Sequence, residues 1–383
     1  MGKTMRAIGL MSGTSMDGID VALIETDGEN HVERRACLTV PYDAPFRSDL
    51  AAALAEARAL TDRTARPGCL AAVEADLTDR HAEALLQFLA DRMLQRSAVD
   101  VIGFHGQTVL HKLRMVKPFG AAQLVPDEVA RMLTVQIGDG QRLAARIGID
   151  VVYDLRAADV AAGGQGAPLA PVYHRALAAR LPERPVAVVN VGGVGNVTWI
   201  GRDGTLIAFD TGPGNALIDD WIQGRTGRAM DTDGAIAGSG RVDQDALLAL
   251  LTHDYFGHVP PKSLDRNAFS LDPVRHLSLE DGAATLVAFT ATSLARAREH
   301  FPEEPKLWVI SGGGRRNRTL MSMIASHVES AVAPAEAAGF DGDAVEAEAW
   351  AYMAVRSLKG LPITFPGTTG VQAPLTGGVL ARK

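Results

Sequence analysis

Short apolar runs alternate with longer amphipathic stretches along the chain, and polar or glycine-rich turns separate them. Residues 6–26 read as a β-hairpin, and residues 69–94 carry apolar side chains at helical spacing. Residues 99–104 read as a buried strand, and a last helix is expected over 343–359. Further strands, each followed by a polar turn, are expected over 186–191, 206–209 and 307–310. This order of strand, turn and helix predicts an α/β protein.

The length of 383 residues allows two domains with a core each. We expect a first lobe over 1–145 and a second lobe over 146–342, with the segment 343–383 returning to the first lobe. Aromatic residues make up only 5% of the chain and Gly reaches 39, which is typical of α/β enzymes with many tight turns.

Charge and cysteine content narrow the class of protein further. The formal net charge of -7, without a cluster of Lys or Arg, argues against nucleic acid or a membrane as partner. Cys37 and Cys69 are the only cysteines and form no CxxC motif, so we expect neither a disulfide framework nor a structural zinc site. The N-terminus lacks the apolar core of a signal peptide, and no stretch has membrane-spanning length without charges. The cytoplasm is therefore the expected compartment.

The most informative motif is the run from Gly9 to Leu23. In it, hydroxyls, carboxylates and glycines separate two apolar, strand-like stretches. Gly13 and Gly18 can adopt positive φ and leave room for a ligand at the backbone. The hydroxyls of Ser12, Thr14 and Ser15 can then face one point, and such a nest of donors suits a polyphosphate. A plain hairpin turn would need only an Asp-Gly pair and leaves these hydroxyls unexplained.

The second motif runs from Asp210 to Asn215, where a strand is expected to end in a glycine turn before a helix that begins near Ala216. The Asp210 carboxylate would lie beside a helix N-terminus, whose N–H groups attract phosphate. The alternative is structural, with Asp210 forming the turn and Asn215 capping the helix. That alternative does not require an aspartate and two glycines together.

The third motif, Ser311 to Gly314, places three glycines between a strand and a helix, so that an adenine ring could lie on bare backbone. A capping turn would need only one glycine. Other nucleotide and hydrolase motifs are absent from the sequence, namely GxxxxGK[ST], a helix-opening GxGxxG, HExxH and GxSxG.

Two glycine turns for phosphates and a third for adenosine resemble the superfamily of sugar kinases, actin and heat-shock chaperones. The resemblance implies an α/β, two-lobed actin-like ATPase (ribonuclease H-like) fold with ATP in the interlobe cleft. Members of that superfamily usually begin the first turn with an aspartate, whereas this chain has Leu10 there. Asp17 and Asp20 are then the candidates for metal contacts, and the choice between them stays open.

The ordered motifs together resemble one branch, the anhydro-N-acetylmuramic acid kinases, nearly from end to end. The matching blocks are GLMSGTSMDGID, HGQT, TVQIGD, DLR, GGQGAPL, NVGG, DTGPGN, DTDG, PPKS and SGGG. The resemblance implies that 1,6-anhydro-N-acetylmuramic acid gains water at C1 and phosphate at O6, giving N-acetylmuramic acid 6-phosphate and ADP in peptidoglycan recycling. It also implies ATP and Mg²⁺ as cofactors and a homodimer as the assembly.

The same resemblance assigns residue roles, with Asp210 as the catalytic base that activates water. It implies ATP binding by Gly13, Thr14, Ser15, Met16, Asp17, Gly18, Ile19, Asp20, Gly192, Gly193, Gly212, Gly214, Gly312, Gly313, Gly314 and Asn317.

Three further residues are substrate candidates, each with a structural alternative. Arg156 could pair with the lactyl carboxylate of the sugar or with Asp154 or Asp159. Glu346 could face the sugar or be a solvated helix charge, and His105 could contact substrate or act as a structural hydrogen-bonding group.

Lys262 and Ser263 follow two prolines on a loop that could reach the ligand. The segment Lys112 to Leu133 is longer than the family pattern leads us to expect. Two other functions stay open at this point. A kinase for an ordinary hydroxyl of another amino sugar would keep the nucleotide turns, and an actin-type ATP-binding scaffold would not need Asp210.

Overall fold

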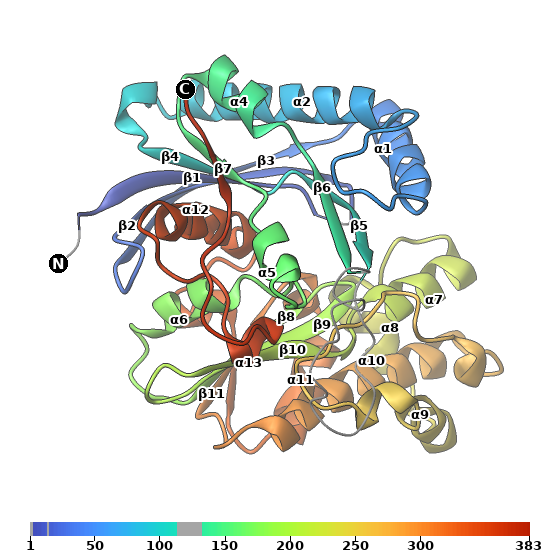
Figure 1. The fold of residues 1–383 in the computed structure, drawn as a ribbon. Coiled ribbons are helices and arrows are strands. Elements are labelled where there is room, and N and C mark those ends of the chain that lie inside the picture. The colour runs from blue at the N-terminus through green and yellow to red at the C-terminus, as the bar shows by residue number, and fades with distance from the viewer. Residues whose placement is uncertain (1–2, 14, 113–131) are drawn as a thin grey trace. The chain divides into compact units, whose positions relative to one another are not determined.

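A computed structural model describes residues 3–13, 15–112 and 132–383, and it divides the chain into two compact units (Figure 1). The first unit holds the described residues up to Ala179 together with Ala344–Lys383, and the second holds Arg180–Asp343. The division falls after Ala179 and not near residue 145 because β7 (Val151–Tyr153) pairs with β4 (Val101–Phe104) in the first sheet. Among the described helices, none combines the length and apolar composition needed to span a bilayer.

The first unit is built on a six-stranded mixed sheet of order β13-β7-β4-β1-β2-β3. Its remaining strands are β1 (Met5–Met11), β2 (Gly18–Thr26), β3 (Val32–Pro41) and β13 (Val379–Ala381). β1 and β2 form the expected hairpin, and β1, β4 and β7 run parallel. A separate antiparallel pair follows β4, formed by β5 (Gln107–Lys112) and β6 (Leu133–Ile137).

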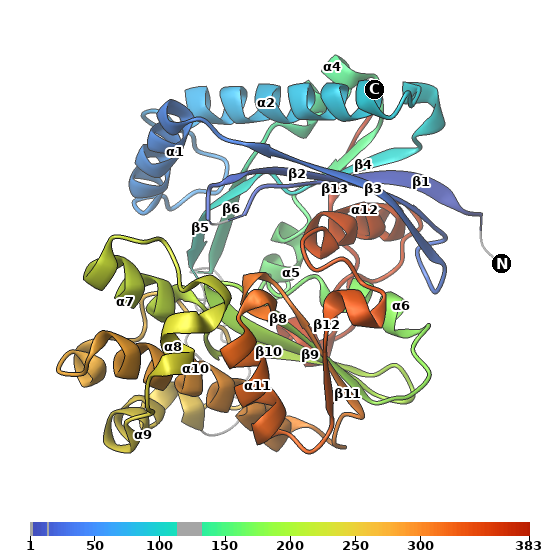
Figure 2. The ribbon, with the colours of Figure 1, turned by 180° about the vertical axis from the view of Figure 1, so that it is seen from behind.

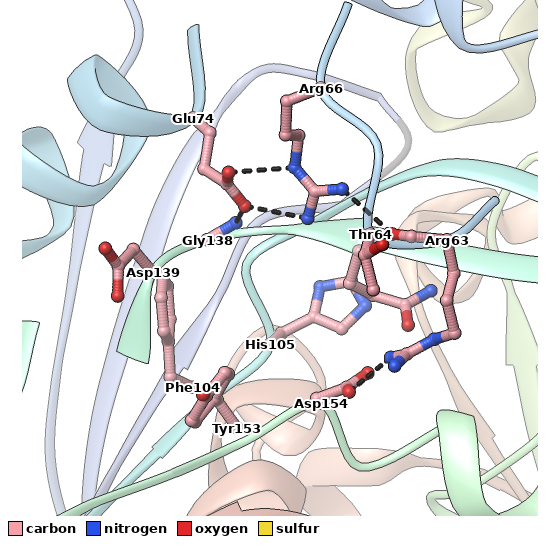
Figure 3. Close-up of a pocket in the computed structure, with 11 residues that line it drawn as sticks. Arg63, Thr64, Arg66, Glu74, Phe104, His105, Gly138, Asp139, Tyr153 and Asp154 are labelled. Atoms are coloured by element: carbon pink, nitrogen blue, oxygen red, sulfur yellow. Dashed lines mark hydrogen bonds and ion pairs between the residues drawn. The ribbon is translucent and has the colours of Figure 1, made fainter. Parts of the chain in front are cut away.

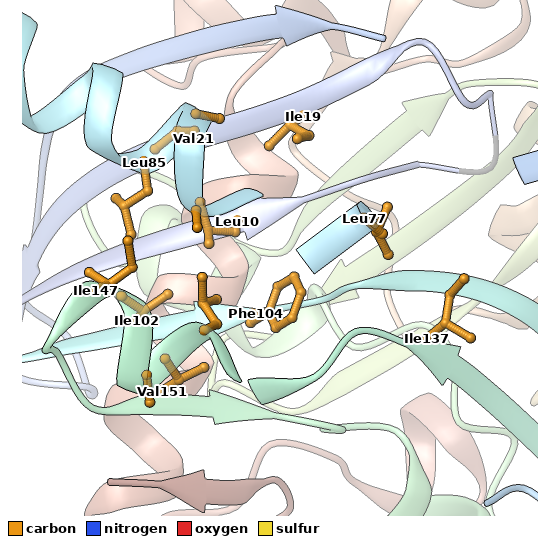
Figure 4. Close-up of a cluster of buried hydrophobic side chains, with 14 of the residues drawn as sticks. Leu10, Ile19, Val21, Leu77, Leu85, Ile102, Phe104, Ile137, Ile147 and Val151 are labelled. Atoms are coloured by element: carbon orange, nitrogen blue, oxygen red, sulfur yellow. The ribbon is translucent and has the colours of Figure 1, made fainter. Parts of the chain in front are cut away.

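Helices cover both faces of this sheet (Figures 1 and 2). One face carries α1 (Ala44–Ala57), α2 (Leu70–Asp91) and α4 (Gly140–Ile147), whose apolar side chains pack with Leu10, Val21, Ile102 and Phe104 (Figure 4). The other face carries α12 (Val345–Leu358), and the unit also contains α5 (Ala157–Ala161), α6 (Pro171–Ala178) and α13 (Pro366–Thr369). The helices expected over 69–94 and 343–359 are confirmed as α2 and α12.

Two paired glycines let α12 lie directly on the sheet. Gly9 of β1 and Gly103 of β4 are register partners. A Cβ at Gly9 would lie 1.7 Å from the Ala347 carbonyl oxygen, and one at Gly103 would lie 2.1 Å from the Trp350 carbonyl oxygen. No side chain fits at either position, so the helix that carries Glu346 and Trp350 is held close to the strand ends.

The second unit is built on a five-stranded sheet of order β10-β9-β8-β11-β12. Its strands are β8 (Val186–Val191), β9 (Val194–Ile200), β10 (Leu206–Pro213), β11 (Leu307–Ser311) and β12 (Ala331–Pro334). Its helices are α7 (Ala216–Thr226), α8 (Ala235–Ser239), α9 (Gln244–Leu251), α10 (Leu279–Ala295) and α11 (Arg318–His327). The core of this unit contains the large side chains of Phe209, Trp221, Phe289 and Trp308.

The two sheets share one strand order. In each, a central strand has two successive antiparallel strands on one side and two parallel strands on the other. This is the ribonuclease H-like topology, present once in each unit, and the expected two-lobed α/β fold is confirmed. One local expectation is wrong, because β10 does not end at Asp210. It continues to Pro213 through a register shift between Asp210 and Gly212, still paired with β9.

Candidate active site

The turn between β1 and β2 is braced from inside by Ser12. This serine is fully buried, and its hydroxyl donates to Oε1 of Gln107 at 2.6 Å and accepts from the Tyr42 hydroxyl at 2.9 Å. The Gln107 amide donates to the Gly13 carbonyl at 3.2 Å. The expectation that the Ser12 hydroxyl faces a phosphate is therefore wrong.

The left-handed residue of this turn is Met16, with φ of 54°, and not Gly13 or Gly18 as we expected. Gly18 is required for a different reason, because a Cβ there would lie 2.5 Å from the Val40 carbonyl oxygen on the adjoining strand. Gly13 is partly exposed, and a Cβ there would make only an ordinary contact, with the Ser15 hydroxyl at 3.5 Å. The backbone at Gly13 is thus accessible to a ligand.

The other residues of the turn differ in exposure. Asp17 is exposed and accepts a hydrogen bond from the Ser15 hydroxyl at 2.9 Å, and Asp20 is partly exposed. Ile19 belongs to the core of the first unit, so only its backbone is available to a nucleotide. Thr14 lies outside the described residues, as does most of the insertion Lys112 to Leu133.

His105 and Arg156 lie together in the first unit, just beyond the ends of β4 and β7. His105 Nδ1 is 3.0 Å from the Ser12 carbonyl oxygen, and its Nε2 is 3.5 Å from Nη2 of Arg156. Burial, followed by the charge of Arg156, holds the pKa of His105 well below its usual value. The imidazole is therefore neutral, with Nδ1–H donating to the carbonyl and Nε2 left as an acceptor.

Arg156 forms no ion pair with either aspartate that the sequence offered as a partner. Asp154 pairs with Arg63. Asp159 accepts from the Gly166 N–H and from the hydroxyl of a threonine in α13, each at 2.6 Å. Arg156 is therefore within ion-pair distance of neither Asp154 nor Asp159, although the charge of Asp159 still acts on its pKa.

The other contacts of Arg156 satisfy only part of its guanidinium. Its Nη1 donates to the Gly166 carbonyl at 2.8 Å, while within the described residues its buried Nε has no hydrogen-bond partner. Its guanidinium carbon lies 5.4 Å from the centre of the Trp350 ring. Burial lowers the pKa of Arg156 to about 10, and the charges of Glu346 and Asp159 act in the opposite direction. Glu346 itself is exposed in the first turn of α12.

A cavity of about 260 Å³ opens beside His105 (Figure 3). It is lined by Arg63, Thr64, Arg66, Glu74, Phe104, His105, Gln136, Gly138, Asp139, Tyr153 and Asp154. Arg66 donates to both oxygens of Glu74, at 2.8 and 3.0 Å, and Arg63 pairs with Asp154. Because both arginines are paired, the cavity is polar without an excess of positive charge. The sequence did not indicate these arginines, since the loop between α1 and α2 carries no motif.

Three glycine turns meet at one end of the second sheet. The turn Gly192–Gly193 follows β8, and its two carbonyls accept the N–H groups of Asn215 and Gly214 at 2.7 and 2.9 Å. Asn215 precedes α7, but its side chain does not cap that helix as the structural alternative expected. Its Nδ2 instead donates to the Val191 carbonyl at 3.0 Å, which joins the ends of β8 and β10.

The third turn, after β11, packs against the same point. Gly312 has φ of 73°, and a Cβ there would lie 2.3 Å from Oδ1 of Asn190 and 2.7 Å from the Val191 carbonyl oxygen. Gly313 is exposed, and a Cβ there would make only an ordinary contact with Nδ2 of Asn215 at 3.6 Å, so a flat ligand can approach its backbone. Asn317 is buried and caps α11 by accepting the Leu320 N–H at 2.9 Å.

The remaining turn glycines are required by packing. A Cβ at Gly214 would lie 2.2 Å from the Gly192 carbonyl oxygen, one at Gly212 would lie 2.8 Å from the side chain of Ser293, and one at Gly314 would lie 2.5 Å from the side chain of Val191. The structure therefore brings the predicted residues 192–193, 212–215 and 312–314 together in the second unit.

Asp210 lies on β10, the edge strand of the second sheet, directly before the three glycine turns that meet at the end of this sheet. Its Oδ2 accepts the Leu264 N–H at 2.8 Å, and its side chain is partly exposed. Burial raises the pKa of Asp210 to about 7, although the hydrogen bond from Leu264 acts to lower it. A carboxylate with this pKa is half ionised near neutral pH, which suits a general base.

No group of three or more His, Cys, Asp or Glu side chains that could hold a metal ion occurs in the part of the chain that the structure describes. Magnesium bound with a nucleotide needs only one or two carboxylates, because phosphates and waters supply its other ligands. The exposed Asp17 and the partly exposed Asp20 fit that requirement.

A duplicated ribonuclease H-like fold with glycine turns at the strand ends and a partly exposed carboxylate beside them is typical of the sugar-kinase and actin-like ATPase class. The model of the anhydro-N-acetylmuramic acid kinase family matches residues 5–383. A relative from Rhizorhabdus wittichii with that name is 55% identical over 380 residues, covering 99% of both chains. One from Rhodospirillum rubrum is 55% identical over 377 residues, covering 97% of this chain and 93% of the relative. The chain belongs to the anhydro-N-acetylmuramic acid kinase family.

Two solved structures align with most of the chain at low identity. Component A of (R)-2-hydroxyglutaryl-CoA dehydratase from Acidaminococcus fermentans has a TM-score of 0.49 and 10% identity, covering 93% of this chain and 99% of that one. A glucokinase of the ROK family from Streptomyces griseus has a TM-score of 0.39 and 14% identity, covering 91% and 99%. The family assignment rests on the family model and the curated relatives.

Proposed function

We propose that the chain transfers the γ-phosphoryl group of ATP to O6 of 1,6-anhydro-N-acetylmuramic acid while water adds at C1. The C1–O6 bond breaks, the ring opens, and the products are N-acetylmuramic acid 6-phosphate and ADP. Membership of the family supports this reaction. The observation in the structure that carries it furthest is the partly exposed Asp210 carboxylate on β10, directly before the glycine turns, whose pKa burial raises to about 7.

Asp210 acts in this proposal as the base that takes a proton from the attacking water. An inverting glycosidase needs a base for water and an acid for the departing oxygen. Here the γ-phosphoryl group captures the departing O6, so one carboxylate base is sufficient. Burial makes Asp210 more basic than an exposed aspartate, while its partial exposure keeps it in reach of the water.

Arg156 binds the lactyl carboxylate of the sugar in this proposal. A guanidinium with no carboxylate partner among the described residues, and with a buried Nε lacking a hydrogen bond, is well suited to a fork-like contact with a carboxylate. His105 supports Arg156 through its neutral Nε2. We assign the sugar ring to the cavity beside His105, whose paired arginines leave polar groups for hydroxyls. Glu346 does not line this cavity, and its assignment to the sugar rests on the family resemblance.

The nucleotide is assigned to the glycine turns. Gly13 is partly exposed and Gly313 is exposed, which allows close approach of phosphate and of the adenine ring respectively. Mg²⁺, held with the phosphates near Asp17 or Asp20, would offset the charge on the transferring phosphoryl group. We also propose the homodimer and the cytoplasmic location that the family resemblance implies.

The test is incubation of the purified protein with Mg-ATP and the anhydro sugar in ¹⁸O-water, followed by mass spectrometry. A 6-phosphorylated product with ¹⁸O at C1 supports coupled ring opening and phosphorylation. ATP binding without that product would refute the proposal. Phosphorylation of a free hydroxyl on another amino sugar would then identify an ordinary amino-sugar kinase, and nucleotide-dependent assembly would identify a scaffold.

A further inference from the structure

The loop segment Pro260–Leu264 lies along the free edge of β10 and contacts Asp210 twice. The Asp210 N–H donates to the Lys262 carbonyl at 3.1 Å, as it would to a neighbouring strand. Two residues later, the Leu264 N–H donates to Oδ2 of the same aspartate at 2.8 Å. In addition, the Tyr255 hydroxyl donates to the Asp210 carbonyl. Backbone and carboxylate of the proposed base are thus both held by one loop.

The loop is anchored by the side chain of Lys262. Only 7% of this lysine is exposed, although the sequence suggested that it could reach a ligand. Its Nζ lies 4.8 Å from the centre of the Tyr255 ring and 5.6 Å from that of Phe209, the residue before Asp210. It lines a cavity of only about 10 Å³, too small for more than one water. Lys262 therefore lies in the interior of the second unit.

Both the buried stem of Lys262 and its amine, which faces the Tyr255 and Phe209 rings, contribute to the anchoring. Burial, followed by repulsion from Arg296, lowers the pKa of Lys262 to about 8, and Glu299 only partly opposes this. The other titratable groups that face the amine are Tyr255 and His300. The amine nevertheless lies over both rings, and the methylene stem that carries it is buried with it.

We propose that Lys262 is a positioning residue, whose buried side chain fixes Pro260–Leu264 so that the Leu264 N–H holds one oxygen of Asp210 and leaves the other for water. This inference rests on the proposed role of Asp210 as the base. In the described part of the chain, no hydrogen bond to the other oxygen, Oδ1, is present. A fixed Oδ2 gives the carboxylate one orientation, and fixed orientation is a large part of catalytic efficiency.

The positioning has a consequence for the pH profile. The hydrogen bond from Leu264 lowers the pKa of Asp210 against the larger effect of burial. Loosening the loop would remove that hydrogen bond, so the carboxylate would ionise at higher pH. The acid limb of kcat/KM, which reports the free enzyme's base, would then move upward. A purely structural loss of folded protein would lower kcat without moving this limb.

The experiment compares Lys262→Ala with Lys306→Ala, an exposed lysine of the same unit that serves as the matched control. For Lys262→Ala we expect a fall in kcat on the order of tenfold and an upward move of the acid limb by about one pH unit, with the KM for ATP little changed. Lys262→Met keeps the stem, so its loss should be smaller than that of Lys262→Ala. An unmoved acid limb in Lys262→Ala, or equal losses in the Met and Ala variants, would overturn the proposal.

A second variant covers poor folding of Lys262→Ala. Incorporating the α-hydroxy analogue of leucine at Leu264 replaces the amide by an ester and deletes only the N–H. The acid limb should again move upward, and an unmoved limb would contradict the inference. Asp210→Asn distinguishes a failure of the proposed role of Asp210 as base from a failure of the positioning role of Lys262. If that variant keeps its turnover, the proposed role of Asp210 fails. If it is inactive while Lys262→Ala behaves as wild type, only the positioning role fails.

Discussion

Replacing Asp210 by Asn should make the protein more stable near neutral pH, because the site disfavours the charged form of this side chain. The pKa of Asp210 rises from its ordinary 3.8 to about 7 through burial. The ionised carboxylate is therefore less stable in the folded protein than in the unfolded chain. The free energy of unfolding falls as the pH rises and the carboxyl ionises. Asn has a similar shape, keeps an oxygen to accept the Leu264 N–H, and carries no charge.

The magnitude follows from the pKa difference. About 3 pH units at roughly 1.4 kcal/mol each give an upper limit of about 4 kcal/mol for the penalty of the ionised form. Partial exposure of Asp210 screens part of this, so we expect a gain of about 2–4 kcal/mol for Asp210→Asn at pH 8. Below about pH 4 both states are protonated and the gain vanishes. Between pH 4 and 7 it grows, because the unfolded state ionises first, and above pH 7 it is constant.

Urea unfolding of the two proteins at pH 5, 6, 7 and 8, followed by tryptophan fluorescence, measures this gain. Three of the four tryptophans, Trp199, Trp221 and Trp308, lie in the second unit with Asp210, so the signal reports mainly on that unit. Asp219, whose pKa is raised to about 6 by burial, is common to both proteins and cancels in the difference. Equal stability at pH 8, or a difference that does not change with pH, would refute the reasoning.

Three other outcomes are expected. Asp210→Asn should lose turnover by at least about a thousandfold while ATP and sugar still bind, as isothermal titration calorimetry and initial rates can show. Arg156→Lys should raise the KM for the sugar about tenfold or more, because an ammonium cannot make the fork-like contact, and should change the KM for the analogue without the lactyl group far less. An equal effect on both sugars would contradict that role. Gly312→Ala should weaken ATP binding and destabilise the second unit by about 2 kcal/mol or more, because its Cβ would lie 2.3 Å from Oδ1 of Asn190 and φ is 73°. A thermal shift and nucleotide affinity equal to wild type would contradict this.

The sequence predicted the elements whose local pattern is strong. The amphipathic stretch over 69–94 forms α2, and the apolar runs over 99–104 and 186–191 form β4 and β8. The strand through Asp210 is longer than predicted. The prediction ended it early because glycine and proline usually end strands. Here the bulge between Asp210 and Gly212 and the pairing with β9 carry the strand to Pro213. That pairing is a tertiary effect, which local propensity does not contain.

The sequence predicted those residues of the candidate site that belong to short motifs. It did not predict contacts between segments that are far apart in the chain. The motifs indicated Asp210 and the glycine turns, and the structure brings the three turns of the second unit together. Contacts of Asp210 with Leu264 and Tyr255 were not predictable, because each joins residues about 45 or more positions apart, and one uses only a backbone N–H. The buried position of Lys262 was missed for the same reason, since a lysine after two prolines usually faces solvent.

The same burial that makes Asp210 a better base weakens the fold around it, whereas the hydrogen bonds of the adjoining glycine turns stabilise the strand end. Gly192 and Gly193 accept backbone N–H groups from the residues that follow β10, and the Asn215 side chain ties this strand end to β8. These hydrogen bonds lie at the strand end, beside the carboxylate whose ionisation is unfavourable. Asn215→Ala should therefore cost more stability above pH 7, where Asp210 is charged, than at pH 5. A pH-independent cost would mean that the turns and the carboxylate act separately.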